Sequence, residues 1–343
     1  MDTAGLWEHA PRYFNTASYG LPPRAGIDAM TAVLADWSVG QTSFESWESA
    51  VTASRECFAR LVNVPAHHVA IGAAVSEQFG LVATALPDRA KVLVPEGEFT
   101  SVVFPWAVQA DRGVELTTAP VAKLAEAIDA STTLVAFSLV QSASGEVAPF
   151  DDILAAARHH GALVAVDGTQ SCGWLPFDAS TVDALAVHTY KWMMSPRGAS
   201  LLVLAPELRE RMRPLAAGWF AGDNPHTSYY GLPLRLATDA RRFDTSPAWF
   251  SWVGAQPALE VIERLGVQNI GNHNVRLANR LRQGLELEPG NSAIVSVDIA
   301  DAERKLERAG IRASVRAGRI RLSCHVYTTD DDVDDALNTL TNP

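Results

Sequence analysis

The chain has 343 residues, of which 48% are hydrophobic and 20% are charged, and its formal net charge is −11. This length and composition suit a globular protein with one large domain and a smaller one. No stretch resembles a membrane helix, and the N-terminus lacks the basic start and apolar core of a secretion signal, so we expect a soluble, cytoplasmic protein without a membrane partner. The negative charge, without any cluster of Lys and Arg, predicts no nucleic acid partner.

The three cysteines, Cys57, Cys172 and Cys324, lie far apart in the sequence. Their odd number and wide spacing suit a reducing compartment better than a disulfide scaffold. They also lack the spacing of metal ligands, so we expect no zinc or other metal site.

Short apolar runs alternate with helical patterns through the first two thirds of the chain. This βαβ rhythm, with runs rich in Val, Leu and Ala, predicts a mostly parallel central sheet flanked by helices, with ligands bound beyond the carboxyl ends of the strands. Strands are expected at residues 69–71, 91–94, 114–116, 133–137, 163–166, 185–187 and 200–204, and helices at 25–37, 77–86, 102–110, 121–130 and 151–160.

The pattern changes after about residue 246. Helices are then expected at 257–265, 274–285 and 301–309, strands at 293–299 and 319–323, and a final acidic helix from about residue 330. This arrangement predicts a smaller C-terminal α+β domain. The expected division is a large α/β domain over residues 16–245 and a small α+β domain formed by residues 1–15 together with 246–343.

A lysine and an aspartate stand at the ends of two expected strands. Asp167 ends the run Ala162-Leu163-Val164-Ala165-Val166, and Lys191 follows the run that includes 185–187. An amine can hold pyridoxal phosphate as a Schiff base, and a carboxylate can keep the pyridine nitrogen protonated so that the ring accepts carbanion electrons. The pairing therefore points to pyridoxal 5'-phosphate as the cofactor, with Lys191 and Asp167 as catalytic residues.

A phosphate site is expected where a strand runs into a helix through small residues, since free backbone N–H groups and the helix dipole favour an anion there. The segment 71–78, with the sequence IGAAVSEQ, has this form. Ser76 is expected to be both the N-cap and a hydroxyl donor. We expect Val75 and Ser76 to bind the cofactor phosphate, although this pattern is common in α/β proteins and gains its meaning from Lys191 and Asp167.

Six short segments occur in an order that carries a family resemblance. They are AVSE at 74–77, EFTS at 98–101 with PW at 105–106, VQS at 140–142 with Gly145, DGTQ at 167–170, HTYKW at 188–192 and RLS at 321–323. In these segments the chain resembles class V aminotransferases, a family that includes cysteine desulfurases, C–S lyases, kynureninase and isopenicillin N epimerase. The resemblance covers about residues 13–340 and implies the fold type I architecture, pyridoxal phosphate, an amino-acid substrate and a homodimer with shared active sites.

Carried over position by position, the resemblance implies cofactor contacts beyond Lys191 and Asp167. It implies that Gln170 contacts the ring oxygen of the cofactor and that Phe99 stacks on the face of the cofactor ring. An apolar ring serves stacking but not proton transfer, so Lys191 is expected to move protons itself. Thr245, within the segment 242–247, belongs to a stretch through which the neighbouring subunit contacts the phosphate in related dimers.

Some positions depart from the desulfurase-like pattern. His188 and Tyr190 stand where a serine and a histidine are usual before the lysine. His188 is expected to donate to the phosphate, with a histidine satisfied at a strand end as the alternative. Ser142 stands where desulfurases often have an asparagine that contacts the ring oxygen of the cofactor, so Ser142 is also expected to bind the cofactor.

The C-terminal region bears on the substrate. Arg321 matches the family arginine that binds a substrate carboxylate, and Arg316 matches a second one, which implies an α-amino acid substrate. The stretch 314–323 runs through without the inserted loop that carries the nucleophilic cysteine of desulfurases. Desulfuration through an enzyme persulfide is therefore disfavoured, and Cys172 and Cys324 are expected to be packing residues.

The leading functional hypothesis is an aminotransferase-like enzyme in which Lys191 moves the α-proton of an amino acid to the cofactor. A β-lyase acting on a cysteine-derived substrate comes second, and an amino-acid epimerase third. A different class of protein, a non-catalytic relative that binds pyridoxal phosphate, is disfavoured because Lys191, Asp167, Gln170 and Arg321 are all present.

Overall fold

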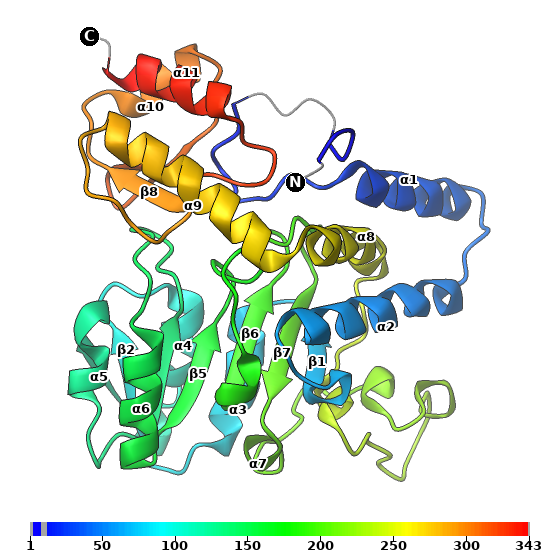
Figure 1. The fold of residues 1–343 in the computed structure, drawn as a ribbon. Helices are drawn as coiled ribbons and strands as arrows, with labels where there is room; N and C mark the ends of the chain where they lie inside the picture. The colour runs from blue at the N-terminus through cyan, green and yellow to red at the C-terminus, as the bar shows by residue number, and fades with distance from the viewer. Residues whose placement is uncertain (1–2, 8–11, 342–343) are drawn as a thin grey trace.

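Two β-sheets organise the molecule, whose computed structural model describes residues 3–7 and 12–341 (Figure 1). The larger has seven strands in the order β1-β7-β6-β5-β4-β2-β3, and the smaller has three in the order β8-β10-β9. The strands are β1 (Val69–Gly72), β2 (Lys91–Pro95), β3 (Glu115–Ala119), β4 (Leu134–Ser138), β5 (Leu163–Asp167), β6 (Ala184–His188), β7 (Ser200–Leu204), β8 (Ile294–Val297), β9 (Ser314–Arg316) and β10 (Arg319–Ser323).

The large sheet is mostly parallel, as its sequence predicts. Strands β3, β2, β4, β5 and β6 pair in parallel, whereas β7 runs antiparallel to both β6 and β1. Strands β4 and β7 are buried along their whole length, which explains their continuous apolar sequences. Because β1, β4, β5 and β6 point the same way, the loops that follow them meet at one edge of the sheet.

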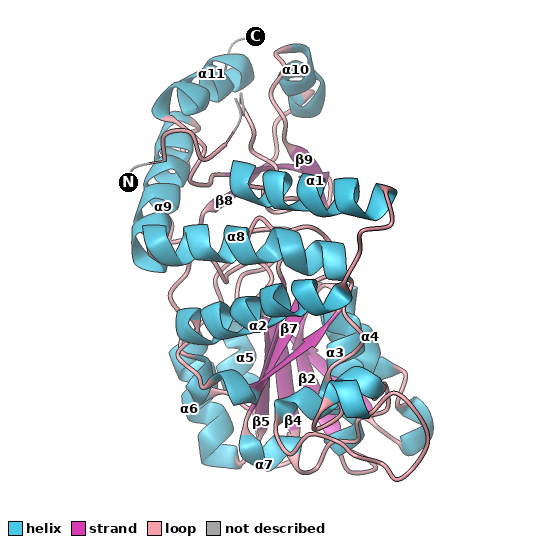
Figure 2. Ribbon diagram, turned by 90° about the vertical axis from the view of Figure 1, so that its right-hand side faces the viewer, coloured by secondary structure: helices cyan, strands magenta, loops and turns pink. Residues whose placement is uncertain are grey.

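Helices cover both faces of the large sheet and pack beside the small one. In Figure 2, α8 lies between α1 and α2, and α2 lies next to the large sheet. The helices are α1 (Arg24–Ser38), α2 (Phe44–Leu61), α3 (Val75–Val82), α4 (Thr100–Ala107), α5 (Leu124–Ala127), α6 (Phe150–His160), α7 (Pro206–Arg209), α8 (Trp249–Leu265), α9 (Val267–Gly284), α10 (Ala302–Arg308) and α11 (Asp330–Thr341).

Several expected boundaries were wrong. Helix α8 was expected to begin at Pro257, but it begins at Trp249 and contains Pro257 in its interior. Because proline has no backbone N–H, the helix lacks one hydrogen bond at this position. The helix expected over 121–130 is a short 3₁₀ turn followed by the single turn α5. Helix α2 and strand β9 were not anticipated. The first half of α2 alternates aromatic with Ser and Glu residues and is largely unburied, so its apolar pattern begins only at Ala50.

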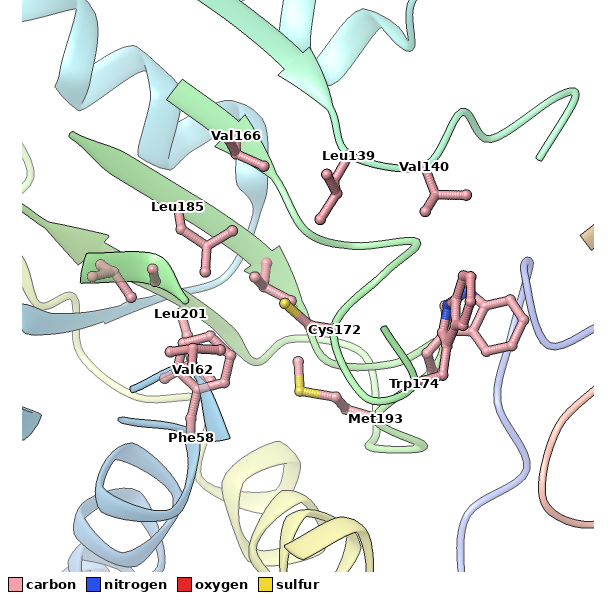
Figure 3. Close-up of a cluster of buried hydrophobic side chains, with 14 of the residues drawn as sticks. Phe58, Val62, Leu139, Val140, Val166, Cys172, Trp174, Leu185, Met193 and Leu201 are labelled. Atoms are coloured by element: carbon pink, nitrogen blue, oxygen red, sulfur yellow. The ribbon is translucent and has the colours of Figure 1, made fainter. Parts of the chain in front are cut away.

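The core is divided among the faces of the large sheet and the C-terminal elements. Figure 3 shows one part, which includes Phe58 of α2, Leu185 of β6, and Cys172 and Met193 of the loops beyond β5 and β6. A separate core joins α9, α10 and α11 to the small sheet and takes in Phe14 from the N-terminal segment. Helix α8 packs into the large core instead, so the division at residue 245 stays a prediction.

A buried ion pair connects α2 to the start of the large sheet. Arg55 of α2 donates from Nη2 to Asp244 Oδ2 over 2.6 Å, and Asp244 Oδ1 accepts from the backbone N–H of Ile71 in β1 over 2.8 Å. The Arg55 guanidinium also donates to the carbonyl of Val69. Both side chains are almost fully buried. This pair fixes β1 and therefore the loop that leads from β1 into α3.

The substitution Arg55→Ala leaves the Asp244 carboxylate buried with a single backbone donor. We expect it to lower the free energy of unfolding by about 3–5 kcal/mol, the usual cost of breaking a buried pair. Arg60→Ala is the matched control on the same helix, because Arg60 forms an exposed pair with Glu263 and should contribute less than about 1 kcal/mol. Urea unfolding followed by circular dichroism measures both, and equal losses would contradict the role given to Arg55.

Candidate active site

Most of the residues singled out in the sequence lie at the carboxyl edge of the large sheet. Asp167 is the last residue of β5, Lys191 lies three residues beyond β6, and Ser142 lies in the loop after β4. The start of α3 follows β1 at the same edge. Parallel strand ends bring these loops together, in the place where a ligand is expected in such a sheet. That these residues form the binding site stays a prediction.

Lys191 is a buried amine. Its side chain lies between two aromatic rings, with Nζ 5.6 Å from the ring centroid of Phe99 and 5.7 Å from that of Tyr190. Burial lowers the pKa of Lys191 to about 8, and the nearby guanidinium of Arg321 lowers it further, whereas Asp167 acts in the opposite direction. At pH 7 about a tenth of Lys191 is therefore an unprotonated nucleophile, far more than for a lysine with the ordinary pKa of about 10.4.

Asp167 is a buried carboxylate without a cationic partner in contact. Its Oδ1 accepts from the backbone N–H of Thr169 over 2.8 Å, and among the described residues it forms no ion pair. Burial raises the pKa of Asp167 to about 6, although the hydrogen bonds from Thr169 and the charge of Lys191 oppose that rise. A cationic N–H brought against this carboxylate would compensate its burial and lower its pKa.

Gln170 and Ser142 belong to one hydrogen-bonded group. Gln170 Nε2 donates to Ser142 Oγ over 3.1 Å and to the carbonyl of Ala17 over 3.0 Å, while its Oε1 accepts from Trp192 Nε1 over 2.8 Å. The structure therefore places Gln170 beside Ser142 with its amide orientation fixed. Contact of either side chain with the cofactor's ring oxygen stays a prediction.

The start of α3 differs from the expectation in one respect. Ala74 is the N-cap, with an extended backbone, and Ser76 is the second helical residue, so the expectation that Ser76 caps the helix was wrong. The chain turns into the helix two residues earlier than the Ser-Glu pattern suggests. The backbone N–H groups of Val75 and Ser76 nonetheless lie in the first turn of α3, where an anion is favoured.

His188 faces this helix start. Its Nε2 accepts from the backbone N–H of Val75 over 3.2 Å, and its Nδ1 is buried without a partner among the described residues. Because Nε2 accepts, the hydrogen of the neutral ring lies on Nδ1. Burial lowers the pKa of His188 to about 4, so the ring is neutral. Donation from His188 to a phosphate stays a prediction.

Phe99 is half-exposed and occupies the N-cap position of α4, without a side-chain capping bond. A residue not assigned in the sequence, Glu98, holds it in place. The buried Glu98 carboxylate accepts from the backbone N–H of Phe99 over 2.7 Å, from the N–H and hydroxyl of Ser138, and from Nε2 of Gln141 over 2.8 Å. This fully bonded carboxylate positions the Phe99 ring near Lys191.

Arg321 lies on β10 with a side chain that is 1% exposed. It donates to Ser314 Oγ, Ser142 O, Ser142 Oγ and Ser18 Oγ, and no acidic group pairs with it among the described residues. Burial, aided by the charge of Arg316, lowers the pKa of Arg321 to about 10. Arg316 of β9 is exposed and also donates to Ser18 Oγ, over 3.1 Å. The sequence did not reveal Ser18, which lies about 300 positions from both arginines.

Thr245 is the assigned residue that the structure does not bring to the other site residues. Its backbone N–H donates to the carbonyl of Ile71 in β1 over 3.4 Å. That contact lies at the base of the loop into α3, and no contact of the Thr245 side chain with the site is recorded within the described chain. Its assignment to the phosphate of a neighbouring subunit stays a prediction.

The N-terminal segment 13–20 holds the lysine loop from outside. Gly20 donates from its backbone N–H to the carbonyl of Tyr190 over 2.9 Å, and a Cβ at Gly20 would collide with the carbonyl oxygen of Lys191. His325, which follows β10, is fully buried and shares a 3.0 Å hydrogen bond between its Nε2 and the carbonyl of Trp192. The backbone on both sides of Lys191 is therefore fixed by segments remote in sequence.

All three cysteines of the chain are free and buried. Burial raises the pKa of Cys57 and of Cys172 to about 12, and the pKa of Cys324 is raised still further. Within the described ranges, no group of three or more His, Cys, Asp or Glu side chains is arranged to hold a metal ion. In the same part of the chain no helix combines the length and apolarity needed to cross a membrane.

These residues fit pyridoxal phosphate. Lys191 is a buried amine with a lowered pKa, and Asp167 is a buried carboxylate with no ion pair among the described residues. The first turn of α3 offers the backbone N–H of Ser76, since that of Val75 already donates to His188 Nε2. Lys191 would hold the cofactor covalently, Asp167 would hold the proton on its ring nitrogen, and α3 would receive its phosphate.

Substitution of Gly20 tests how closely the N-terminal segment must approach Lys191. Gly20→Ala places a methyl group against the Lys191 carbonyl, and overpacking of this kind costs about 1–3 kcal/mol. We expect roughly tenfold weaker binding of pyridoxal phosphate in absorbance titrations of the apoprotein. Gly218→Ala is the control, because nothing lies within 4 Å of a Cβ there. Equal affinity of the two variants would contradict the proposed contact.

The lowered pKa of Lys191 predicts the pH dependence of cofactor attachment. The neutral amine is the nucleophile, so the attachment rate to apoprotein should rise about tenfold per pH unit and level off above about pH 8. A lysine with the ordinary pKa of about 10.4 would continue to rise. Lys191→Ala should abolish the product of borohydride reduction, whereas Lys91→Ala should retain it.

The rates are measured by stopped-flow absorbance and corrected with a model amine for titration of the cofactor itself. A corrected rate that still climbs steeply between about pH 8 and pH 10 would show that burial does not shift Lys191.

Comparison with known proteins places this geometry in a family. The family model described as Aminotransferase class-V matches residues 13–311. The chain is 27% identical over 318 residues to Uncharacterized aminotransferase YcbU of Bacillus subtilis, covering 85% of this chain and 84% of that protein. It is 27% identical over 382 residues to isopenicillin N epimerase of Streptomyces clavuligerus, covering 95% and 94%, respectively.

Solved structures share the fold over nearly the whole chain. A complex between the cystine C–S lyase C-DES and its reaction product, cysteine persulfide, has a TM-score of 0.86 at 24% identity, covering 96% of this chain and 97% of that one. A C-DES mutant with glycine covalently linked to the PLP cofactor has a TM-score of 0.88 at 23% identity, covering 99% of each. Because the family model spans most of the sequence, the chain belongs to the class V aminotransferases and is a pyridoxal phosphate-dependent enzyme of fold type I.

Proposed function

We propose that this enzyme transforms an α-amino acid in an aminotransferase-like reaction with Lys191 as the proton-transferring base. The observation that carries the proposal is the environment of the Lys191 amine. It is buried, its pKa is lowered to about 8, and an apolar ring, that of Phe99, lies 5.6 Å from Nζ. Lys191 therefore supplies a base, and Phe99 supplies none.

Each residue has a separate task in this reaction. Pyridoxal phosphate, when bound, accepts the electrons left on the substrate's α-carbon. Lys191 Nζ would take the α-proton and deliver it to the cofactor, which a neutral amine with a pKa near 8 can do at physiological pH. Asp167 holds the proton on the ring nitrogen, and Arg321 binds the substrate carboxylate. Glu98 keeps the Phe99 ring in place.

The same residues bear on the alternatives. Inversion at the α-carbon needs a proton donor on the face opposite to Lys191, and the Phe99 ring has none. Epimerisation is therefore disfavoured, although one relative is named isopenicillin N epimerase. The three buried thiols, with raised pKa values, disfavour a persulfide on the enzyme. Direct β-elimination from a cysteine-derived substrate needs only Lys191 as base, so it is the second candidate.

We further propose a cytoplasmic homodimer in which Thr245 of the partner subunit reaches the cofactor phosphate. Free buried cysteines support a reducing compartment. Exposed apolar side chains support an interface, since Phe104 and Val108 near the C-terminal end of α4 are 58% and 70% exposed and Trp37 of α1 is 58% exposed. Size-exclusion chromatography with light scattering distinguishes a dimer from a monomer.

Product analysis tests the proposed reaction. Purified holoprotein is titrated with a panel of L-amino acids while its visible spectrum is recorded, and the products are assayed. Accumulation of pyridoxamine phosphate with a keto acid supports transamination. Pyruvate and ammonia from cysteine conjugates would identify a β-lyase, and inversion of the α-carbon an epimerase. No spectral change with any amino acid would leave the non-catalytic relative.

Arg321→Ala tests the carboxylate site. We expect the affinity for reactive amino acids to fall by about 2–5 kcal/mol, the cost of removing one partner from a buried charge pair. Arg319→Ala is the matched control on the same strand, because Arg319 is exposed and donates to the carbonyl of Ser296 instead. Unchanged KM in Arg321→Ala would remove Arg321 from the substrate site.

A further inference from the structure

Ser18 lies between two guanidinium groups. Its Oγ accepts from Arg321 Nη2 over 2.8 Å and from Arg316 Nη2 over 3.1 Å. Within the described ranges no acidic side chain forms an ion pair with either arginine, and burial together with the charge of Arg316 lowers the pKa of Arg321. Two like charges held against one neutral oxygen indicate a site built for an anion.

The donors of Arg321 are mostly committed to neutral oxygens. Nε donates to Ser314 Oγ over 3.2 Å, Nη1 donates to the carbonyl and the hydroxyl of Ser142, and Nη2 donates to Ser18. A guanidinium has five N–H donors, so these four bonds leave one, on Nη2. A carboxylate cannot be bound by both arms of this guanidinium unless the bonds to Ser142 or Ser314 break.

The hydroxyl of Ser18 supplies what Arg321 lacks. Its two acceptor positions are used by the two arginines, and its own hydrogen is donated to no acceptor among residues 3–7 and 12–341. Ser18 is only partly buried, so an incoming anion can reach it. The free O–H therefore lies beside the free N–H of Arg321 and the unused donors of Arg316.

We propose that the Ser18 hydroxyl binds the α-carboxylate of the substrate directly, as a third ligand beside Arg321 and Arg316; this inference rests on the proposed amino-acid substrate. The carboxylate accepts from Ser18 Oγ, and Arg321 keeps its bonds to Ser142. Because Ser142 also accepts from Gln170, the cofactor side of the site is undisturbed when substrate binds. The site selects free carboxylates over amines, esters and amides, since it presents donors and positive charge alone.

The experiment measures discrimination between an amino acid and the amine that lacks its carboxylate. Holoprotein is titrated with L-alanine and with ethylamine, and the apparent dissociation constants are read from the visible spectrum. In Ser18→Ala the preference for alanine should fall roughly ten- to hundredfold, the worth of one hydrogen bond to a charged group. Ser18→Thr keeps the hydroxyl and should retain most of the preference. Binding of ethylamine should be unchanged in both variants.

A double-mutant comparison separates direct binding from support of the arginine. If Ser18 only positions Arg321, the loss caused by Ser18→Ala disappears in the Arg321→Ala background; direct binding predicts that a loss remains. The inference is overturned if that loss disappears in the double mutant. It is also overturned if Ser18→Ala keeps the preference for alanine while Arg321→Ala does not. Either result leaves the proposed function standing. A wild-type protein that does not prefer alanine over ethylamine overturns the proposed function instead.

Discussion

The active site depends on two opposite charges that are buried at one sheet edge without an ion pair between them. Burial pushes Lys191 and Asp167 toward their neutral forms, with pKa values near 8 and 6. A direct salt bridge would remove this tension and also remove the reactive amine. Holding the two groups apart leaves room for a cofactor that bonds to one and presents a cationic N–H to the other. The fold must supply the rigidity that prevents their collapse onto each other.

Much of that rigidity comes from the N-terminal segment 13–20, which lies between the small sheet and the lysine loop. Ala17 accepts from Gln170, Ser18 accepts from Arg321, and Gly20 packs against the Lys191 carbonyl. On the opposite side His325 bonds to the Trp192 carbonyl. The segment thus connects Arg321, the proposed carboxylate ligand, to the loop of Lys191, the proposed cofactor ligand. The positions of these two residues are therefore set together.

The sequence could predict the sheet because its central strands are buried on both faces and read as continuous apolar runs. It could also place Lys191 and Asp167 at the ends of two such runs, with Asp167 as the last residue of β5 and Lys191 three residues beyond β6. It could not find Ser18, Glu98 or His325 as parts of the site, because their partners lie from 40 to more than 300 positions away. The N-cap of α3 was misplaced for a local reason: the backbone turns at Ala74, and Ser76 lies inside the helix.

The reactions available to this protein are limited because its thiols are buried and few side chains near Lys191 can transfer a proton. Its relatives include proteins named as probable cysteine desulfurases, yet each thiol here is buried with a raised pKa. A sulfur atom that leaves a substrate must therefore depart directly, without transfer to an enzyme thiolate. His188 is neutral because burial lowers its pKa to about 4, and Phe99 has no ionisable group. Under the proposed function, proton transfer therefore depends on Lys191. A substrate with a leaving group on its β-carbon would undergo elimination, whereas one without such a group would be transaminated when Lys191 delivers the proton to the cofactor.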